Sequence, residues 1–390
     1  MQLITGWMIF ILSCVGHTEW WVMTINRSFS FPIKATKLRR FRTLHDLGIV
    51  SFPFLLTWKC GIGSHGLFNG GSISDQSPLW QAVLVFTLLG IIPLFLAALR
   101  WQWKRRFEFH RVASKEFFDV AAIARQDPKL VDVRGSRWHP VMISPWNGIY
   151  TLEVNVKRIQ TTNPLAASRR PLRVVHISDL HFIDCPGADF YRFVVSKMLE
   201  QNADTFVFTG DLIDKPELLE MAVDILRPLT KVAPCFFILG NHDWRYDYEH
   251  FRSTLAASGW KCVTGTHERI QLGDRNVLFA GSELPWIGNA PPSVTHAGVD
   301  LRILLGHTPD QYRFGQKCGY DVMLSGHTHG GQVVLPIIGP VYSPSLYGVS
   351  FAAGLFQLGK MTMHVSRGIG AKDPLRINCS PELTCLEIHC

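Results

Sequence analysis

The sequence predicts an α/β fold that follows an N-terminal region of membrane-spanning helices. Three observations carry this prediction: short apolar runs alternate with helical stretches from residue 151 onward, polar clusters directly follow several of these runs, and one long apolar stretch without charge lies near the front of the chain. The 390 residues are 47% hydrophobic and only 18% charged, a composition that excludes a disordered chain.

The apolar stretch at residues 79–99 contains no charged side chain and is 21 residues long. A helix of about 20 apolar residues crosses the hydrocarbon core of a bilayer. It is followed at once by Arg100, Trp101, Trp103 and Lys104. Aromatic residues mark the end of a span at either interface, and basic residues are typical of its cytoplasmic side, so we expect the rest of the chain to be cytoplasmic.

Two weaker apolar segments, residues 3–16 and 47–58, precede this span and flank a basic loop. If all three segments cross the membrane, the basic loop and the remainder of the chain lie on the same, cytoplasmic side. A helix in the membrane interface is the alternative for both segments. A cleaved signal peptide is the alternative for the first, although no basic residue precedes its apolar stretch.

The net charge of +8 lies entirely within residues 1–112, while the remaining 278 residues are neutral. A nucleic-acid-binding protein would carry basic charge on its folded domain, so no nucleic acid is expected as a partner. We therefore expect a membrane anchor region over residues 1–112, a polar connector with short helical stretches over 113–147, and a globular domain over 148–390.

Strands are expected where short β-branched or aromatic runs occur, and helices between them. Residues 151–159 alternate as in an edge strand. Asp214 is placed to cap the second of the two helices. The further expected strands are 173–178, 206–208, 235–239, 276–280, 301–305 and 321–324, and the helices are 188–201 and 216–231.

Polar clusters follow five of these strands directly. Ligands bind at the carboxyl ends of strands in open α/β sheets, so the five clusters should meet in one place. They contain Asp179 and His181, Asp211 and Asp214, Asn241 and His242, His307, and His327 and His329. Carboxylates together with neutral imidazoles favour Mn²⁺, Fe or Zn²⁺ over Mg²⁺ or Ca²⁺.

In chain order the clusters read DLH, GDLID, GNHD, GH and GHTH. This series resembles the motifs of the calcineurin-like metallophosphoesterases. The flanking text, including HISDLHF and LSGHTHGGQVVLP, is similar to a bacterial branch of membrane-associated phosphodiesterases. The resemblance covers about residues 152–387 and implies a β-sandwich flanked by helices with two divalent metal ions, Mn²⁺, Fe or Zn²⁺.

The resemblance also implies a role for each cluster. Asp179, His181 and His329 would hold one metal ion, Asn241, His307 and His327 the other, and Asp211 would bridge both. A hydroxide shared by the two ions would attack phosphorus, His242 would act as general acid, and Asp214 would orient His242. Lys215 and Pro216 stand where the protein phosphatases of this superfamily have an arginine, which argues against that branch.

The function expected is hydrolysis of a phosphodiester or pyrophosphate at the cytoplasmic face of the inner membrane, and the membrane anchor motivates a substrate linked to lipid. A specific alternative is hydrolysis of UDP-2,3-diacylglucosamine in lipid A synthesis. A second alternative is a non-catalytic scaffold or regulatory domain with the same fold. Because metal binding needs neutral imidazoles, activity should fall below about pH 6.

Overall fold

The computed structural model describes residues 2–108, 111–120, 139–142, 144–161, 170–183, 186–292, 298–371 and 373–390. The chain divides into two compact units. The helical unit consists of Met1–Lys104 and Pro336–Ser350, and the α/β unit consists of Arg105–Leu335 and Phe351–Cys390. Part of the expected connector, residues 121–138 and 143, lies outside the described residues.

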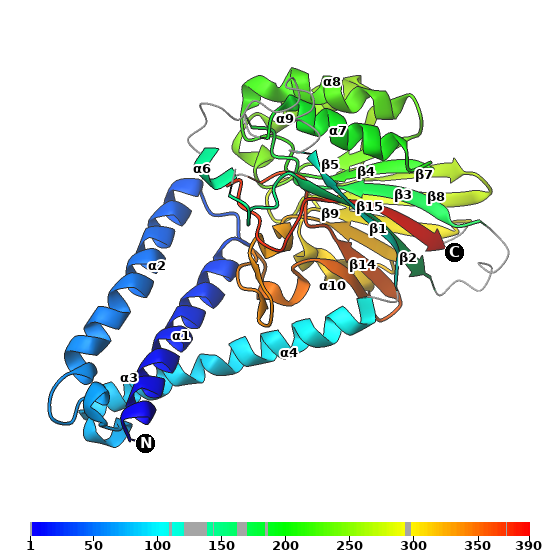
Figure 1. Ribbon diagram of the computed structural model, residues 1–390. Coiled ribbons are helices and arrows are strands. Elements are labelled where there is room, and N and C mark those ends of the chain that lie inside the picture. Colours follow the sequence, from blue (N-terminus) through cyan, green and yellow to red (C-terminus); the bar gives the residue numbers. More distant parts are fainter. Residues whose placement is uncertain are drawn as a thin grey trace. The chain divides into compact units, whose positions relative to one another are not determined.

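The α/β unit is built on two mixed sheets (Figure 1). One has the strand order β1-β2-β15-β3-β4-β5-β6 and the other β13-β14-β10-β9-β8-β7. The strands of the first sheet are β1 (Val112–Asp119), β2 (Thr151–Gln160), β15 (Glu382–His389), β3 (Leu172–Ile177), β4 (Thr205–Thr209), β5 (Cys235–Ile238) and β6 (Trp260–Cys262). Those of the second are β13 (Gly354–Leu358), β14 (Met361–Val365), β10 (Val322–Ser325), β9 (Leu301–Gly306), β8 (Arg275–Ser282) and β7 (His267–Leu272).

The two sheets pack face to face, and helices cover their outer faces. Successive side chains of a strand point to opposite faces. On β4, Val207 therefore joins the apolar core between the sheets, while Phe206 and Phe208 join the core under the helices. The first sheet is covered by α7 (Ala188–Leu199), α8 (Leu219–Thr230) and α9 (Tyr248–Ala257), and the second by α10 (Tyr312–Lys317). The expected helix-flanked sandwich is confirmed.

Two local expectations are wrong. The strand at 151–159 is not at an edge, because β2 pairs with β15 on one side and with β1 on the other. The partner β1 comes from the segment expected to be a connector. Asp214 does not cap a helix: the short 3₁₀ turn Pro216–Leu218 precedes α8 without a side-chain cap.

The helical unit contains four long helices, α1 (Gln2–Ser28), α2 (Ala35–Leu56), α3 (Pro78–Leu89) and α4 (Ile91–Glu108). Short turns at Thr57–Gly61, Leu67–Asn69 and Ile73–Asp75 connect α2 to α3. Within the described part of the chain, two helices are long and apolar enough to cross a membrane, Gln2–Ser28 and the stretch Pro78–Arg105. The first apolar segment thus continues well beyond residue 16.

Small residues permit close helix contacts within the helical unit. A Cβ atom on Gly16 would lie 1.9 Å from the carbonyl oxygen of Thr87, and one on Gly90 would lie 2.2 Å from the carbonyl oxygen of Gly16. Small residues play this part where helices associate in membranes. The outside of the unit is apolar, with Phe54 73% exposed and Leu79 71% exposed. Such a surface is suited to lipid rather than to water.

Candidate metal centre

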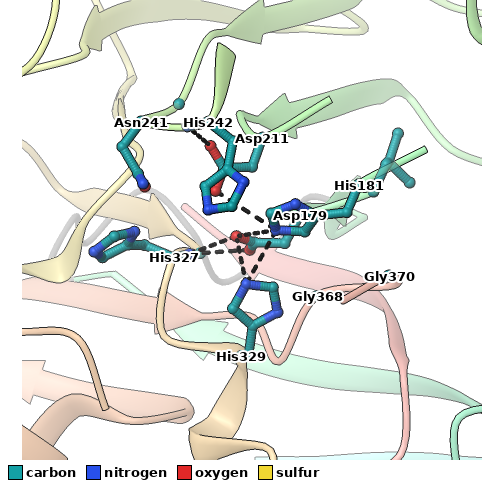
Figure 2. Close-up of polar contacts among 12 residues, drawn as sticks. Asp179, His181, Asp211, Asn241, His242, His327, His329, Gly368 and Gly370 are labelled. Atoms are coloured by element: carbon teal, nitrogen blue, oxygen red, sulfur yellow. Dashed lines mark hydrogen bonds and ion pairs between the residues drawn. The ribbon is translucent and has the colours of Figure 1, made fainter. Parts of the chain in front are cut away.

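The five polar clusters of the sequence come together at the carboxyl ends of β3, β4, β5, β9 and β10. In Figure 2 the side chains of Asp179, His181, Asp211 and His329 point toward one another. Five of the candidate residues have a left-handed backbone conformation, with φ values between 44° and 70°: Asp179, His181, Asp211, His327 and His329. Non-glycine residues with positive φ cluster at functional sites, because the surrounding structure must hold them there.

The first half of the centre contains Asp179, His181, Asp211 and His329. Their ligand atoms lie within 4.8 Å of one another. His181 Nε2 is 3.1 Å from His329 Nε2 and 3.6 Å from Asp211 Oδ2, and His329 Nε2 is 3.6 Å from Asp179 Oδ1. Ligands bound to one ion at about 2.1 Å are separated by roughly 3.0–3.5 Å, so these spacings suit a shared ion.

The second half contains Asp211, His307 and His327, which also form a group that could hold a metal ion. Asn241 lies beside it, with its Oδ1 3.1 Å from His307 Nε2. The same nitrogen is 3.4 Å from Asp211 Oδ2, the atom that also faces His181. One carboxylate oxygen of Asp211 therefore faces both halves of the centre.

A third group links Asp214 to two histidines. Its Oδ2 lies 3.0 Å from His181 Nδ1, and its Oδ1 contacts His242 Nδ1. The backbone N–H of His242 donates to Asp211 Oδ1 at 2.7 Å. Burial would raise the pKa of the Asp214 carboxyl, but His181 and His242 hold it far below its ordinary value. Asp214 is therefore a carboxylate that orients both rings.

The electrostatics of the centre divide the histidines into two kinds. Burial lowers the pKa of His181, but Asp214, Asp211 and Asp179 outweigh it and raise that pKa to about 9. Against the same effect of burial, Asp211 and Asp179 raise the pKa of His307 to about 9. Burial and the neighbouring histidines instead lower the pKa values of His327 and His329 well below the ordinary range. The concentrated negative charge of the aspartates thus draws cations to the centre.

Buried imidazole nitrogens without hydrogen-bond partners in the described part of the chain show that this set of side chains suits a pair of metal ions. His327 Nε2 and His329 Nδ1 are buried and have no hydrogen-bond partner among the described residues. A buried polar atom without a partner is costly, and bonding to a metal ion removes that cost for His327 Nε2. Space is also kept free: a Cβ on Gly240 would lie 2.2 Å from Asp211 Oδ1, and one on Gly326 would lie 2.2 Å from Asp179 Oδ2.

Asp243 holds two loops of the centre together through hydrogen bonds to their backbone, a role that the sequence does not predict. Its two carboxylate oxygens accept hydrogen bonds from the backbone N–H groups of four residues at 2.8–3.3 Å, those of Asp211, Leu212, Ile213 and Gly240. Burial and the nearby Asp211 raise the pKa of Asp243 to about 7 despite these donors. One side chain thereby fixes the loops after β4 and β5 relative to each other.

A buried hydrogen-bond chain reaches the same centre from between the sheets. Lys157 Nζ lies 3.1 Å from His364 Nε2 and 2.6 Å from Glu382 Oε1. His364 Nδ1 lies 2.9 Å from His176 Nδ1, and His176 Nε2 lies 2.9 Å from Thr209 Oγ1. The carbonyl oxygen of Thr209 accepts from His307 Nδ1 at 2.7 Å.

The direction of this chain follows from its first donor. An ammonium group can only donate, so His364 Nε2 accepts and its proton is on Nδ1. His176 Nδ1 must then accept, which leaves His176 Nε2–H to donate to Thr209. Burial lowers the pKa of His176 to about 3, so this ring is neutral. From sequence these two histidines are expected to be structural only, and no local motif connects them to the site.

Trp286 closes one side of the centre. Its ring centroid lies 5.0 Å from that of His327 and 5.7 Å from that of His307. It belongs to the loop after β8, part of which (residues 293–297) is outside the described residues. An aromatic wall excludes water from one face of the imidazole pair, which strengthens electrostatic interactions there.

Comparison with known proteins agrees with this geometry. The family model for calcineurin-like phosphoesterases matches residues 172–331. The chain is 30% identical over 224 residues to the phosphodiesterase YaeI of Escherichia coli (strain K12), covering 56% of this chain and 82% of that protein.

Two further relatives extend the comparison. The chain is 28% identical over 309 residues to the UDP-2,3-diacylglucosamine pyrophosphatase LpxG of Chlamydia trachomatis, covering 63% of this chain and 93% of that protein. It is 26% identical over 362 residues to a transmembrane protein with a metallophosphoesterase domain from Danio rerio, covering 80% of this chain and 74% of that protein. The apolar helices and this last similarity indicate association with a membrane. The chain belongs to the calcineurin-like metallophosphoesterases, hydrolases that use a dinuclear metal centre.

Proposed function

We propose that this protein hydrolyses phosphodiesters or pyrophosphates at the five-loop centre, where Asp211 would be a ligand to both of two metal ions. The position of Asp211 Oδ2 carries the proposal, because it lies 3.6 Å from His181 Nε2 and 3.4 Å from His307 Nε2. A single oxygen between two ligand sets is the arrangement that a dinuclear centre requires. Asp179, His181 and His329 would hold one ion, and Asn241, His307 and His327 the other.

When bound, the ions supply positive charge for the phosphate oxygens and activate the attacking water. The side chains supply the rest. Asn241 is a neutral ligand, which limits the negative charge that faces an anionic substrate. The contact of Asp214 with His242 Nδ1 holds that ring and leaves Nε2 available to a leaving oxygen. His242 would therefore be the general acid and Asp214 its positioning residue.

The scaffold alternative is disfavoured by the completeness of the centre. All seven expected metal ligands lie at the carboxyl ends of the strands, and His327 Nε2 is left without another partner in the described part of the chain. A domain that had lost its reaction would have no physical reason to keep such a costly arrangement.

We infer that residues 1–112 anchor the enzyme with the α/β unit on the cytoplasmic side of the inner membrane. The C-terminal ends of α1 and α4 both contact residues 336–350, through Asn26 and Gln102, so these two ends lie on the same side. Both ends are next to the basic clusters of the sequence, which favours the cytoplasm. The second weak segment, residues 47–58, would cross back as part of α2.

The substrate class that we favour is a phosphoester linked to lipid. The membrane-associated helices motivate it, and LpxG, which is similar to this chain over most of its own length, is named for a pyrophosphatase reaction on a diacylated sugar nucleotide. UDP-2,3-diacylglucosamine is therefore the first individual substrate to test. Mn²⁺, Fe and Zn²⁺ all accept this set of ligands.

The test compares bis-p-nitrophenyl phosphate with its monoester, p-nitrophenyl phosphate, using the detergent-solubilised full chain with added Mn²⁺. We expect hydrolysis of the diester by the native chain and a loss of about 100-fold or more in His242→Ala, in line with the contribution of general acids. His250→Ala, an exposed histidine on α9, is the matched control and should keep full activity. Equal rates for His242→Ala and His250→Ala would exclude the role of His242, and monoester hydrolysis alone would exclude the diesterase.

A further inference from the structure

Residues 336–350 leave the α/β unit and fold with the N-terminal helices. The segment begins four residues after Gln332, which ends the motif that carries His327 and His329, and it ends just before β13. The flanking residues belong to the α/β unit, whereas Pro336–Ser350 forms one compact unit with Met1–Lys104. Nothing in the sequence pattern separates this segment from its surroundings.

One set of contacts joins the segment to the C-terminal end of α1. Asn26 is only 2% exposed, and its Oδ1 accepts a hydrogen bond from the backbone N–H of Ser343 at 3.0 Å. Its Nδ2 donates to the carbonyl oxygen of Val341 at 3.4 Å. The Phe29 and Tyr342 rings meet edge to face with centroids 6.0 Å apart. A buried amide is costly without hydrogen bonds, so Asn26 binds α1 to this segment.

A second set joins the segment to the end of the apolar stretch in α4. Gln102 Nε2 donates to the carbonyl oxygen of Ile337 at 2.8 Å. Gly339, with φ +88°, packs so tightly on the indole of Trp101 that a Cβ there would lie 2.5 Å from Cγ of the ring. Trp101 and Gln102 lie within the stretch of aromatic and basic residues that ends the span, which is where a membrane helix meets the headgroups.

The side chain of Ile337 is 75% exposed although its backbone is fixed beside Gln102. Trp103, in the same turn of α4, is 67% exposed. Both are large apolar groups at the level where the apolar stretch of α4 ends, and Arg100, Lys104 and Arg105 flank Trp103 in sequence. An apolar side chain held at this level, among basic residues, is suited to the boundary between headgroups and acyl chains.

We propose that residues 336–350 form an interfacial loop, the 336–350 loop, in which Ile337 inserts into the lipid beside the cytoplasmic end of α4. The occupant is the bilayer itself, since the loop is continuous with the helices that cross it. Covalent connection then has a consequence for catalysis. Eight residues separate His329 from Ile337, and a chain of that length spans at most about 28 Å.

Whatever the arrangement of the two units, the chain keeps the proposed metal ligand His329 within about 28 Å of Ile337. This consequence rests on the proposed function and deepens it: the substrate is an amphiphile whose phosphoester lies at the interface. The proposed contact of Ile337 with lipid is inferred from the helical unit alone, so it would hold even if the proposed hydrolysis were wrong.

The first experiment measures the lipid contact directly. The photoreactive residue p-benzoylphenylalanine replaces Ile337 in the full chain, which is reconstituted into nanodiscs of phosphatidylcholine and phosphatidylglycerol. The matched control carries the same residue at Val232, an exposed apolar position at the end of α8 in the α/β unit. After irradiation, mass spectrometry should find lipid adducts on the 337 peptide in several-fold excess over the 232 peptide. Absent adducts at 337, or equal adducts at both positions, would overturn the proposal.

The second experiment measures the consequence for substrates. Ile337→Asp and the control Val232→Asp are assayed on hexadecyl p-nitrophenyl phosphate in vesicles and on bis-p-nitrophenyl phosphate in solution. We expect Ile337→Asp to raise the KM for the vesicle substrate several-fold, with kcat and the kinetics of the soluble diester unchanged, and Val232→Asp to change neither. Unchanged KM in Ile337→Asp would refute the catalytic consequence. A native chain that hydrolyses neither compound would instead refute the proposed function and leave the cross-linking result decisive for the lipid contact.

Discussion

The two units of this protein differ in the side chains that they expose on their surfaces. In the α/β unit the apolar side chains are buried, as Phe206 and Phe208 are under the helices, and the buried polar groups gather at one edge of the strands. In the helical unit large apolar side chains such as Phe54 and Leu79 face outward. Its interior holds the small and polar residues Gly16, Ser13 and Asn26 beside a small apolar core around Leu84. The difference shows that one part is built for water and the other for lipid.

The comparison also shows where each unit is vulnerable. Around the metal centre the α/β unit gathers several costly features, namely positive φ values, buried carboxylates and, among the described residues, an imidazole nitrogen without a hydrogen-bond partner. The helical unit concentrates its constraints at close backbone contacts such as that between Gly16 and Thr87. Substitutions around the metal centre should therefore change the rate of hydrolysis. Substitutions at the close contacts of the helical unit should lower its stability and leave the hydrolysis of soluble substrates unchanged.

The largest effect is expected for Asp211→Asn. The substitution removes the negative oxygen that faces both halves of the centre and leaves His181 and His307 with less compensating charge. Diester hydrolysis should fall by more than about 100-fold, beyond the loss typical of groups outside the ligand set. Asp224→Asn, on the exposed side of α8, is the matched control and should behave as the native chain. Retained activity in Asp211→Asn would show that no bridging ligand is needed.

The next effect is a pH dependence of metal binding. His181 and His307, with pKa values of about 9, hold protons at neutral pH that a metal ion must displace. Binding of Mn²⁺ at pH 7.5 should release about two protons per chain, and the apparent affinity should rise with pH until about pH 9. Isothermal titration in buffers of different ionisation enthalpy measures the release. Proton-independent binding at pH 7.5 would contradict the assigned ligands.

In the metal-free protein, the raised pKa values of His181 and His307 make the fold less stable as pH rises, whereas metal binding becomes stronger. A histidine whose pKa is raised above the ordinary value of 6.5 stabilises the fold where it is protonated. This stabilisation is complete below about pH 6.5 and is lost as pH rises through about 9. Thermal unfolding of the metal-free chain should therefore show a falling Tm over this window, and a Tm that rises over it would count against the raised pKa values.

A smaller effect is expected at Thr209, outside the ligand set. Thr209→Val removes the hydroxyl group that accepts from His176 Nε2, while the carbonyl that orients His307 is kept. The buried donor left behind costs about 1–3 kcal/mol of stability, and we expect roughly 10-fold weaker metal binding because the loop after β4 loosens. Thr209→Ser keeps the hydroxyl and should restore both. Equal metal affinity in the two variants would confine the hydrogen-bond chain to a structural role.

The smallest effect on chemistry is expected in the helical unit. Gly16→Leu forces a side chain against the backbone of Thr87, so the unfolding temperature in detergent should fall, with overpacking costs of about 1–3 kcal/mol. Hydrolysis of the soluble diester should not change. Val15→Leu, one residue away on the exposed side of α1, is the control. A large loss of soluble activity in Gly16→Leu would show that the two units do not separate stability from chemistry.

Much of the α/β unit could be predicted from local sequence. Apolar runs such as residues 206–208 and 301–305 match β4 and β9, because buried strands are short and rich in apolar side chains. The candidate residues could be placed together because each follows a strand, and strand ends share an edge of the sheet. Both the apolar runs and the polar residues that follow them are short stretches of sequence, so they can be recognised without knowing which distant residues pack against them.

The rest depends on partners that are distant in sequence. The strand β2 is interior because β1 pairs with it, and the mostly polar, exposed residues of β1 do not by themselves predict a strand. Asp214 has the spacing of a helix cap, but its carboxylate is taken by His181 and His242. The bond from Ser343 to Asn26 joins residues 317 positions apart, and no local pattern predicts it.

The most direct test of the account is the number of metal ions that the centre holds when it is active. The full chain, stripped with chelator and reloaded with Mn²⁺, would be measured by mass spectrometry of its metal content alongside hydrolysis of bis-p-nitrophenyl phosphate. The account predicts two ions per chain, with little activity until the second is bound, and a reduced content in Asp211→Asn. Full activity with a single ion, or with none, would contradict it.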